Sequence, residues 1–252
     1  MSRFLRYTRA MASTDQIFSY CERGQNPAFW AEPFNAVSNA AFLAAALAAG
    51  IAWSRQPASV RGTPEAALIG LVAIIGVGSF LFHTFATRWA NIADAGPIGA
   101  FMFAYAGYTL RRFLALPWIA VAVGLVLFAA LLQIAFTADC PVALRGLVRG
   151  GRCLNGSAGY LPALAMLLGS GLAALARRHG AGPYLFAASA VFALSLAART
   201  IDLEACGASR ILGAQRGTHA LWHTLNALTL AILLFAALRH GARAPFQDQA
   251  VR

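Results

Sequence analysis

The sequence predicts an all-α membrane protein, built as a bundle of seven transmembrane helices. First, 59% of the 252 residues are hydrophobic and only 12% are charged, whereas soluble domains carry roughly 25% charged residues. Second, several apolar stretches reach the length of about 20 residues that a helix needs to cross a bilayer. Third, the net charge of +11 comes from arginine alone, and the arginines lie mainly between those stretches.

Seven apolar segments are expected to form the spanning helices. They cover residues 34–53, 66–85, 92–110, 116–136, 158–176, 184–198 and 217–238. The sixth is short and rich in alanine. Because no internal repeat or low-complexity linker interrupts the pattern, residues 1–252 are expected to form one domain, with residues 1–33 as an N-terminal tail. The tail begins with MSRFLRYTRAMAS, which is basic but lacks the apolar stretch of a cleaved signal peptide.

The basic composition does not indicate a nucleic-acid partner. No basic helix and no aromatic stacking surface accompanies the arginines. Arginines that flank apolar segments instead act as signals for membrane orientation. The expected partners are therefore the lipid bilayer and a membrane lipid.

Two features bear on which side of the membrane each end of the chain faces. All the cysteines fall on the side of the N-terminal tail, at Cys21, Cys140, Cys153 and Cys206, and disulfides persist in oxidising compartments. On the other side arginines crowd the helix ends, at Arg111, Arg112, Arg177, Arg178, Arg239 and Arg243. Because basic residues beside a span mark the cytoplasmic side, we expect the N-terminus outside the cell (the periplasm in a bacterium) and the C-terminus in the cytoplasm.

Five polar residues lie in the predicted spans at a similar depth, near the N-terminal side. They are Ser79 and His83 at the end of the second span, Asp94 at the start of the third, and His219 and His223 at the start of the seventh. Ionisable residues in a spanning segment are costly and usually functional. These five residues are therefore the candidate active site.

The spacing of the histidines suits a metal ion. Residues four apart share a helix face, so His219 and His223 can present two imidazoles to one point, and His83 can add a third. Catalytic zinc typically has three protein ligands and keeps an open position for water. Asp94 would then lie beside that water, and Ser79 beside a reacting carbonyl group. The alternative is that the three histidines only form hydrogen bonds with their neighbours.

Three blocks of sequence add a more specific indication. They are SYCERGQNPAFWAEPFNAVSNAAF at 19–42, GSFLFHTFATRWANIADAGP at 78–97, and a block at 199–226 that contains IDLEAC and GTHALWHTLN. In order and spacing these blocks resemble the alkaline ceramidases, which belong to a superfamily of seven-helix membrane hydrolases that also includes the adiponectin and progestin receptors. The resemblance extends over nearly the whole chain, although the fourth and fifth spans match only in apolar character.

The resemblance implies an activity and a role for each candidate residue. His83, His219 and His223 would bind zinc, Asp94 would be the general base toward the zinc-bound water, and Ser79 would hydrogen-bond the developing oxyanion. The implied enzyme is a hydrolase of sphingolipid metabolism, which cleaves the N-acyl amide bond of ceramide or of a similar lipid amide within the membrane. Zinc that lowers the pKa of water to about 7 and a donor that stabilises the oxyanion suit this reaction.

The family also has a calcium site beside the zinc, and this chain matches it only in part. Glu22, Glu32 and the backbone of Tyr20 match the calcium motif. Ser19 and Gly24 stand where the family has aspartate and asparagine, and the spacing between the two glutamates is one residue short. Because calcium takes about 6–8 oxygen ligands, these differences should weaken the site. Calcium is therefore only a second candidate cofactor.

Several alternatives remain open at this stage. The two glutamates can instead pair with arginines such as Arg23 or Arg210. An intramembrane serine protease based on Ser79 would lack the GxSG pattern and would leave the histidines unexplained. A receptor of the adiponectin or progestin type would keep the zinc without robust hydrolase activity, although the short loops on the cytoplasmic side offer no sizeable signalling domain.

The cysteines allow three pairings, and four free thiols are a further alternative. Cys140 and Cys153 share one loop, between the fourth and fifth spans. The resemblance implies that Cys21 pairs with Cys206, which would hold the N-terminal tail over the mouth of the zinc site.

Overall fold

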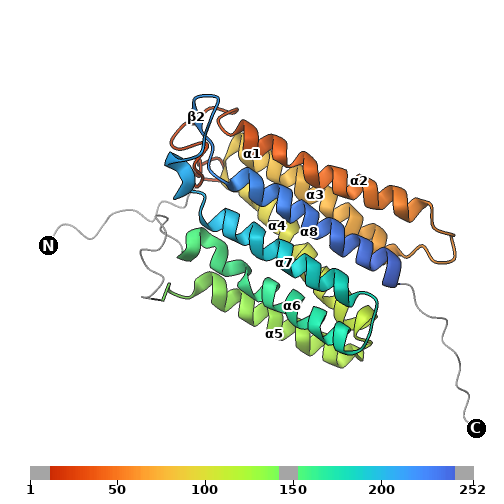
Figure 1. Ribbon diagram of the computed structural model, residues 1–252. Coiled ribbons are helices and arrows are strands. Elements are labelled where there is room, and N and C mark those ends of the chain that lie inside the picture. The colour runs from red at the N-terminus through yellow and green to blue at the C-terminus, as the bar shows by residue number, and fades with distance from the viewer. Residues whose placement is uncertain (1–11, 142–152, 242–252) are drawn as a thin grey trace, which may run out of the picture.

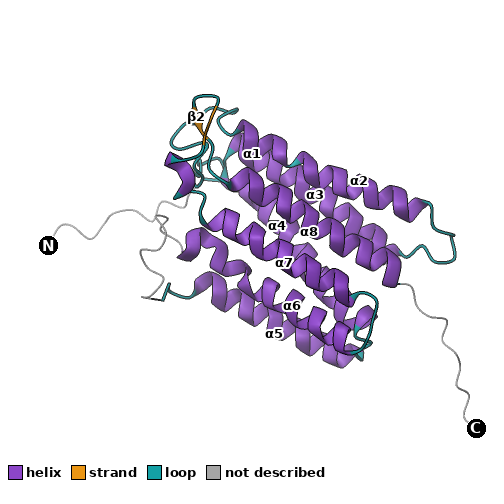
Figure 2. Cartoon of the chain, in the orientation of Figure 1, coloured by secondary structure: helices purple, strands orange, loops and turns teal. Residues whose placement is uncertain are grey.

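The computed structural model describes residues 12–141 and 153–241, and within them the chain is a bundle of long helices (Figure 1). Strands are confined to one short hairpin at one end of the bundle (Figure 2). In chain order the elements are α1 (Pro33–Ser38), α2 (Ala40–Ser54), α3 (Thr63–Phe85), α4 (Arg88–Tyr108), η1 (Thr109–Phe113), α5 (Trp118–Thr137), η3 (Cys153–Tyr160), α6 (Leu161–Ala176), α7 (Gly182–Thr200), η4 (Ala205–Gly207), β1 (Arg210–Ile211), β2 (Ala214–Gln215) and α8 (His219–His240).

Each of the seven predicted segments overlaps a helix, so the all-α prediction is confirmed. Within the described residues, six segments are long and apolar enough to cross a membrane: Pro33–Ser54, Thr63–Phe85, Trp118–Thr137, Cys153–Ala176, Gly182–Thr200 and His219–His240. The exception is α4, whose first two turns carry Arg88, Asn91 and Asp94.

The surface of α5 indicates the surroundings of the bundle. Only 17% of its apolar window is buried, and Ile119 and Val126 are 81% and 68% exposed. Soluble proteins rarely expose a continuous apolar surface of this kind to water. Lipid chains solvate such a surface without cost, so the exposed helices favour a membrane protein.

The helices pack as a ring, and α8 is its most buried member. α8 packs against α2, α3 and α7, α3 packs along α4, and α6 packs along α7. α5 completes the ring through its contacts with α4 and α6. α4 and α6 approach each other only slightly, and an apolar pocket lies between α4, α6 and α8.

The N-terminal segment, residues 12–32, crosses the same end of the bundle as the β1–β2 hairpin (Figure 1). It is fastened to the turn between α3 and α4, where Gln16 and Thr87 form an isolated antiparallel bridge. The Ile17 amide also donates a hydrogen bond of 2.6 Å to the Ala86 carbonyl. We call this end of the molecule the site end, because α3 ends there with His83 in its last turn and α8 begins there with His219.

Candidate metal centre

Three histidine side chains meet at the site end. His83, His219 and His223 are each at most 2% exposed, and each offers a ligand atom within 4.8 Å of the other two. Their ring centroids lie 4.6–5.1 Å apart. Within the described residues this is the one group of three metal-ligating side chains that converge in this way.

Hydrogen bonds leave one nitrogen free on at least two of these rings. Nδ1 of His83 lies 2.6 Å from a carboxylate oxygen of Glu32, so we assign the proton to Nδ1 and the lone pair to Nε2. Nδ1 of His223 lies 2.8 Å from the Ser38 hydroxyl, which donates its own hydrogen to the Asn35 carbonyl. The hydroxyl must therefore accept from Nδ1–H, which again leaves Nε2 as the lone-pair nitrogen.

The remaining nitrogens have the environment expected of metal ligands. Nε2 of His83 and Nδ1 of His219 are buried and have no hydrogen-bond partner. Leaving such groups unpaired is costly, since each loses its hydrogen bonds to water. A metal ion bound by the three imidazoles would remove that cost, and hydrogen bonds to the opposite ring nitrogens are the usual support of ligating histidines. The site thus fits a metal ion, whatever its identity.

Ser79 and Asp94 lie beside this centre, where α3 and α4 approach closely. A Cβ atom on Gly78 would lie 2.0 Å from the Ala93 carbonyl oxygen, so only glycine permits this contact. The two side chains are close enough for a hydrogen bond, and the Asp94 carboxylate also interacts electrostatically with His83. One carboxylate oxygen of Asp94, Oδ1, is buried without a hydrogen-bond partner.

Glu32 contacts the metal centre through His83. Its Oε1 accepts a hydrogen bond of 2.5 Å from Arg23, and its Oε2 accepts bonds from Asn35 and His83. Burial alone would raise the pKa of this carboxyl, but the hydrogen bonds from His83, Asn35 and Arg23 outweigh it and lower the pKa. Glu32 is therefore an ionised group that orients His83.

Glu22 has hydrogen-bond partners of its own, which include none of the three histidines. Its carboxylate accepts hydrogen bonds from the backbone amides of Phe34 and Asn35, at 2.9 and 2.8 Å, and from Arg216 at 2.8 Å. The alternative to the calcium site, in which the glutamates pair with arginines, is found for Glu32 with Arg23, whereas Glu22 pairs with Arg216 and not with Arg210. All four carboxylate oxygens expected as calcium ligands already accept hydrogen bonds from the protein.

Tyr20, whose backbone was the third expected calcium ligand, lies directly on the metal centre. Its ring stacks on His219 with a centroid distance of 3.7 Å. Its carbonyl oxygen accepts a hydrogen bond of 3.2 Å from the Gly24 amide. Tyr20 therefore covers a histidine of the centre from the N-terminal segment.

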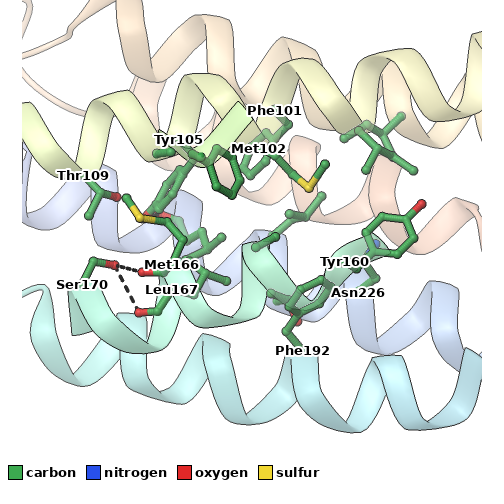
Figure 3. A pocket seen from close by; sticks show the side chains of 18 of the residues that line it. Phe101, Met102, Tyr105, Thr109, Tyr160, Met166, Leu167, Ser170, Phe192 and Asn226 are labelled. Atoms are coloured by element: carbon green, nitrogen blue, oxygen red, sulfur yellow. Dashed lines mark hydrogen bonds between the residues drawn. The ribbon is translucent and has the colours of Figure 1, made fainter. Parts of the chain in front are cut away.

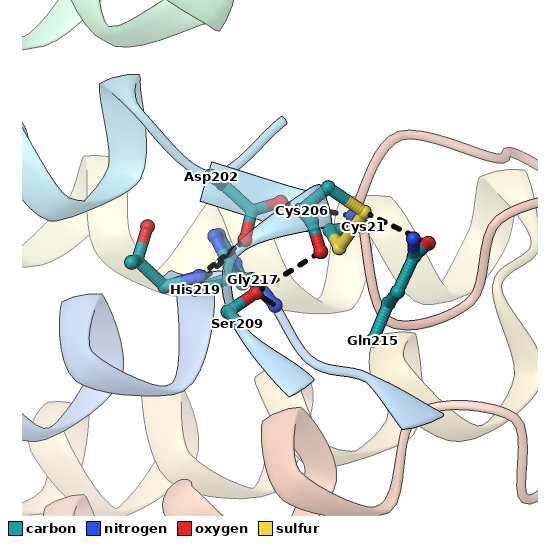
Figure 4. Close-up of a disulfide and its surroundings, with 8 residues drawn as sticks. Cys21, Asp202, Cys206, Ser209, Gln215, Gly217 and His219 are labelled. Atoms are coloured by element: carbon teal, nitrogen blue, oxygen red, sulfur yellow. Dashed lines mark hydrogen bonds between the residues drawn. A yellow bond between two sulfur atoms is a disulfide. The ribbon is translucent and has the colours of Figure 1, made fainter. Parts of the chain in front are cut away.

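Both disulfides lie at the site end. Cys21 is bonded to Cys206 and Cys140 is bonded to Cys153, so the described chain has no free cysteine. The first bond is the pairing that the resemblance implies. It joins the N-terminal segment to the connection between α7 and α8, as the close-up in Figure 4 shows.

Asp202 fastens the start of α8 to the same disulfide (Figure 4). One of its oxygens accepts hydrogen bonds from the amides of Thr218 and His219, and the other accepts one from the amide of Cys21. The chain can pass this close only because residue 217 is glycine, where a Cβ would lie 2.1 Å from the Asp202 carboxylate. Asp202 thereby fixes the helix turn that carries His219.

An apolar pocket lies inside the bundle (Figure 3). It is lined mainly by α4, α6 and α8, and its cavity volume, counted as space for the centres of water-sized spheres, is about 60 Å³. Ile75 lines it one helical turn from Ser79 on α3, and Ile98 lines it one turn from Asp94 on α4. Residues of the pocket wall thus lie one helical turn from Ser79 and Asp94. Deeper residues include Phe101, Met102, Tyr105, Thr109, Met166 and Ser170.

Sequence reasoning assigned no role to Arg199, which lies beside two aromatic rings of the pocket wall. Its guanidinium carbon lies 5.4 Å from the ring centroid of Tyr160 and 5.7 Å from that of Trp222, and both rings line the pocket. It also interacts electrostatically with Asp94 and Tyr20. An arginine near the end of an apolar span is the signal that could have identified it, but at that position the residue also reads as an orientation signal.

Comparison with protein-family models and with curated proteins returned no match for this chain. The resemblance to the alkaline ceramidases therefore rests on the three sequence blocks themselves. The geometry described above is independent of that resemblance.

Proposed function

We propose that this protein is a zinc-dependent membrane hydrolase that cleaves the amide bond of ceramide or of a similar N-acyl lipid. The observation that carries the proposal is the convergence of three buried imidazoles next to a carboxylate with an unpartnered oxygen, with the wall of an apolar pocket one helical turn from that carboxylate. Neither a purely structural histidine cluster nor a serine protease would require all three features together.

Zinc is the metal that best fits three imidazole ligands in a site that carries out hydrolysis. When bound, it acts as a Lewis acid toward a carbonyl group and makes water acidic enough to lose a proton near pH 7. His83, His219 and His223 would hold it. Calcium has no place in this proposal, because hydrogen bonds from the protein occupy the oxygens of Glu22 and Glu32.

The remaining polar groups supply the proton transfer and the hydrogen bond that amide hydrolysis needs. Asp94 accepts the proton of the attacking water at Oδ1, which has no competing partner, and later delivers it to the leaving nitrogen. Ser79 donates its hydroxyl hydrogen to the carbonyl oxygen as negative charge develops there. The Ser79 hydroxyl and the Asp94 carboxylate are close neighbours, so both can act on one amide group.

The apolar pocket gives the substrate its orientation. A lipid chain that occupies the pocket along Ile98 and Phe101 would place its polar linkage near Asp94, one helical turn from Ile98. Substrate would reach this site from the bilayer, because the exposed surface of the surrounding helices is apolar. This arrangement favours a lipid amide over a peptide as substrate.

We further propose that α4 is the seventh span and that the site end faces outward, into the periplasm if the host is a bacterium. α4 is 21 residues long, and its charged residues are confined to the site end. Both disulfides lie at that end, and disulfides persist in oxidising compartments. The C-terminus would then be cytoplasmic.

Incubating the purified protein with a panel of lipid amides, with and without a metal chelator, tests the proposal. We expect release of fatty acid and amine from at least one N-acyl lipid, loss of release after chelation, and recovery on addition of zinc. A protein that retains zinc but hydrolyses none of these lipids would contradict the enzyme and would favour a receptor in which zinc has a structural role.

A further inference from the structure

Arg23 is a buried cation with every N–H group in use. Its side chain is 0% exposed, although arginine is among the residues least often buried. A guanidinium carries five N–H donors in a fixed plane. Five oxygen atoms surround this one, at 2.5–3.2 Å: the Glu32 carboxylate and the carbonyls of Asn26, Ala28, His83 and Thr84.

These five oxygens come from two separate parts of the site end. Two carbonyls and the carboxylate of Glu32, directly before α1, belong to the N-terminal segment. The other two carbonyls belong to the last turn of α3, where the helix dipole is negative. One positive charge thus joins the N-terminal segment to the end of α3 through oxygen atoms alone, which is the way a bound metal ion joins a fold.

The position of the cation matters for the metal centre. Glu32 accepts from Arg23 on one oxygen and contacts Nδ1 of His83 with the other. Arg23 also bonds the backbone carbonyl of His83. It therefore fixes both the backbone of this histidine and the carboxylate that orients its ring.

We propose that Arg23 is a built-in replacement for a second, structural metal ion, and that it positions His83 for metal binding through Glu32. Arg23 is a positioning residue in this scheme and contacts neither metal nor substrate. The inference rests on the three-histidine centre binding a metal, but it does not depend on the reaction. It implies that the centre is indifferent to calcium, because Glu32, one of the expected calcium ligands, and the four carbonyl oxygens beside it already surround a guanidinium.

The sharpest test removes the guanidinium and asks whether an ion can take its place. Arg23→Ala leaves one carboxylate and four carbonyl oxygens around a gap, and these are the oxygen donors that calcium prefers. Full-length parent and variant are purified in detergent, loaded with zinc, and titrated with a competing zinc chelator of known affinity, with and without millimolar calcium chloride. Melting temperature is recorded in parallel.

We expect calcium to change neither the zinc affinity nor the melting temperature of the parent. Arg23→Ala should bind zinc about 10–100-fold more weakly, the usual effect of losing the group that holds a ligating histidine, and calcium should restore part of that affinity. Glu32→Gln should lose zinc affinity to a similar degree, but calcium should not restore it, because the charged oxygen is gone. Arg216→Gln is the matched control: it removes an arginine–glutamate pair at the same end without a contact to a histidine.

Calcium that raises the zinc affinity of the parent, or Arg23→Ala that binds zinc as tightly as the parent, overturns the proposal. If Arg23→Ala does not fold, Arg23→Lys replaces it in the test, because lysine keeps the charge but loses the planar set of donors. Unaltered zinc affinity in Arg23→Lys would contradict the proposed role of Arg23 equally. A parent that takes up no zinc refutes the metal centre and this inference together. A parent that binds zinc without hydrolysing lipid refutes only the hydrolase.

Discussion

The two ends of the bundle both contain polar side chains that bond to the protein, but the groups are arranged differently. At the end opposite the site end, arginines donate to carbonyls of the turns, as Arg177 does to Leu114 and Arg111 to Leu116. At the site end, unpartnered nitrogens of two histidines and an oxygen of Asp94 lie close together. At the opposite end Oε2 of Glu65 and Oγ1 of Thr109 are also buried without a partner, but among the described residues they belong to no group of three metal-ligating side chains. It is the convergence of several unsatisfied ligand atoms at one point that indicates a ligand.

The opposite end also holds a buried carboxylate, which makes the contrast testable. Glu65 accepts a hydrogen bond from the Tyr108 hydroxyl, and it belongs to no group of three metal-ligating side chains among the described residues. Equivalent substitutions at the two ends should therefore have unequal effects. If substitutions at the two ends changed zinc content and turnover alike, the site end would have no special role in function.

The largest difference is expected for histidine. His219→Ala should remove the zinc, about one ion per chain in the parent, together with all turnover, because two imidazoles alone hold zinc poorly. His179→Ala, at the opposite end, should retain both. Metal analysis of the purified variants measures the difference, and full zinc content in a triple His83, His219 and His223 variant would refute the metal centre.

The carboxylates should differ nearly as much in turnover, but not in metal content. Asp94→Asn should keep zinc and lose almost all lipid hydrolysis, because the attacking water loses its proton acceptor. Glu65→Gln should keep zinc and turnover, since the amide oxygen can still accept from Tyr108. Fatty-acid release under saturating substrate is the measurement, and a parental rate for Asp94→Asn would rule out the general-base role.

A smaller effect is expected for serine. Ser79→Ala should keep zinc and lose about 2.7–4 kcal/mol of transition-state stabilisation, a fall of roughly 10²–10³-fold in kcat, as expected for one lost oxyanion donor. Ser189 donates to a carbonyl of its own helix, and Ser189→Ala is the control with little expected change. Equal rates for the two variants would remove Ser79 from the mechanism.

The disulfides should give the smallest effect, on stability. Opening the Cys140–Cys153 bridge should cost about 3 kcal/mol in the chain-entropy model with little loss of turnover. Opening Cys21–Cys206 should additionally weaken zinc binding, because Cys21 is tied to Asp202 and so to His219. Mass spectrometry of alkylated, unreduced protein tests the pairing, and fully alkylated Cys21 and Cys206 would contradict both the bridge and the outward placement of the site end.

Hydropathy predicted the helices well because each spanning segment must be apolar along most of its length. It placed the start of the third helix at residue 92, although α4 begins at Arg88, since the charged first turn does not resemble a span. It also missed the interruption at Asn39 between α1 and α2 and the π-helical turn η1. These features depend on backbone hydrogen bonding, which leaves little trace in hydropathy.

The candidate site was predictable where its residues share a helix. His219 and His223 are one turn apart, so sequence spacing alone indicated their common direction. The contacts of Ser38 with His223 and of Arg23 with His83 join residues 185 and 60 positions apart, and no local pattern encodes them. The same distance explains why Arg216 and not Arg210 pairs with Glu22, since the β1–β2 hairpin decides which arginine turns toward the N-terminal segment.

The anchoring of His219 has a consequence for biogenesis. Two of the three histidines of the candidate metal centre lie on α8, which follows the other described helices in the chain, and its first turn is held by Asp202 to the backbone of Cys21 in the N-terminal segment. The three histidines therefore come together only after α8 has been synthesised. A chain cut short before α8 would keep only His83, and we expect it to bind no metal ion.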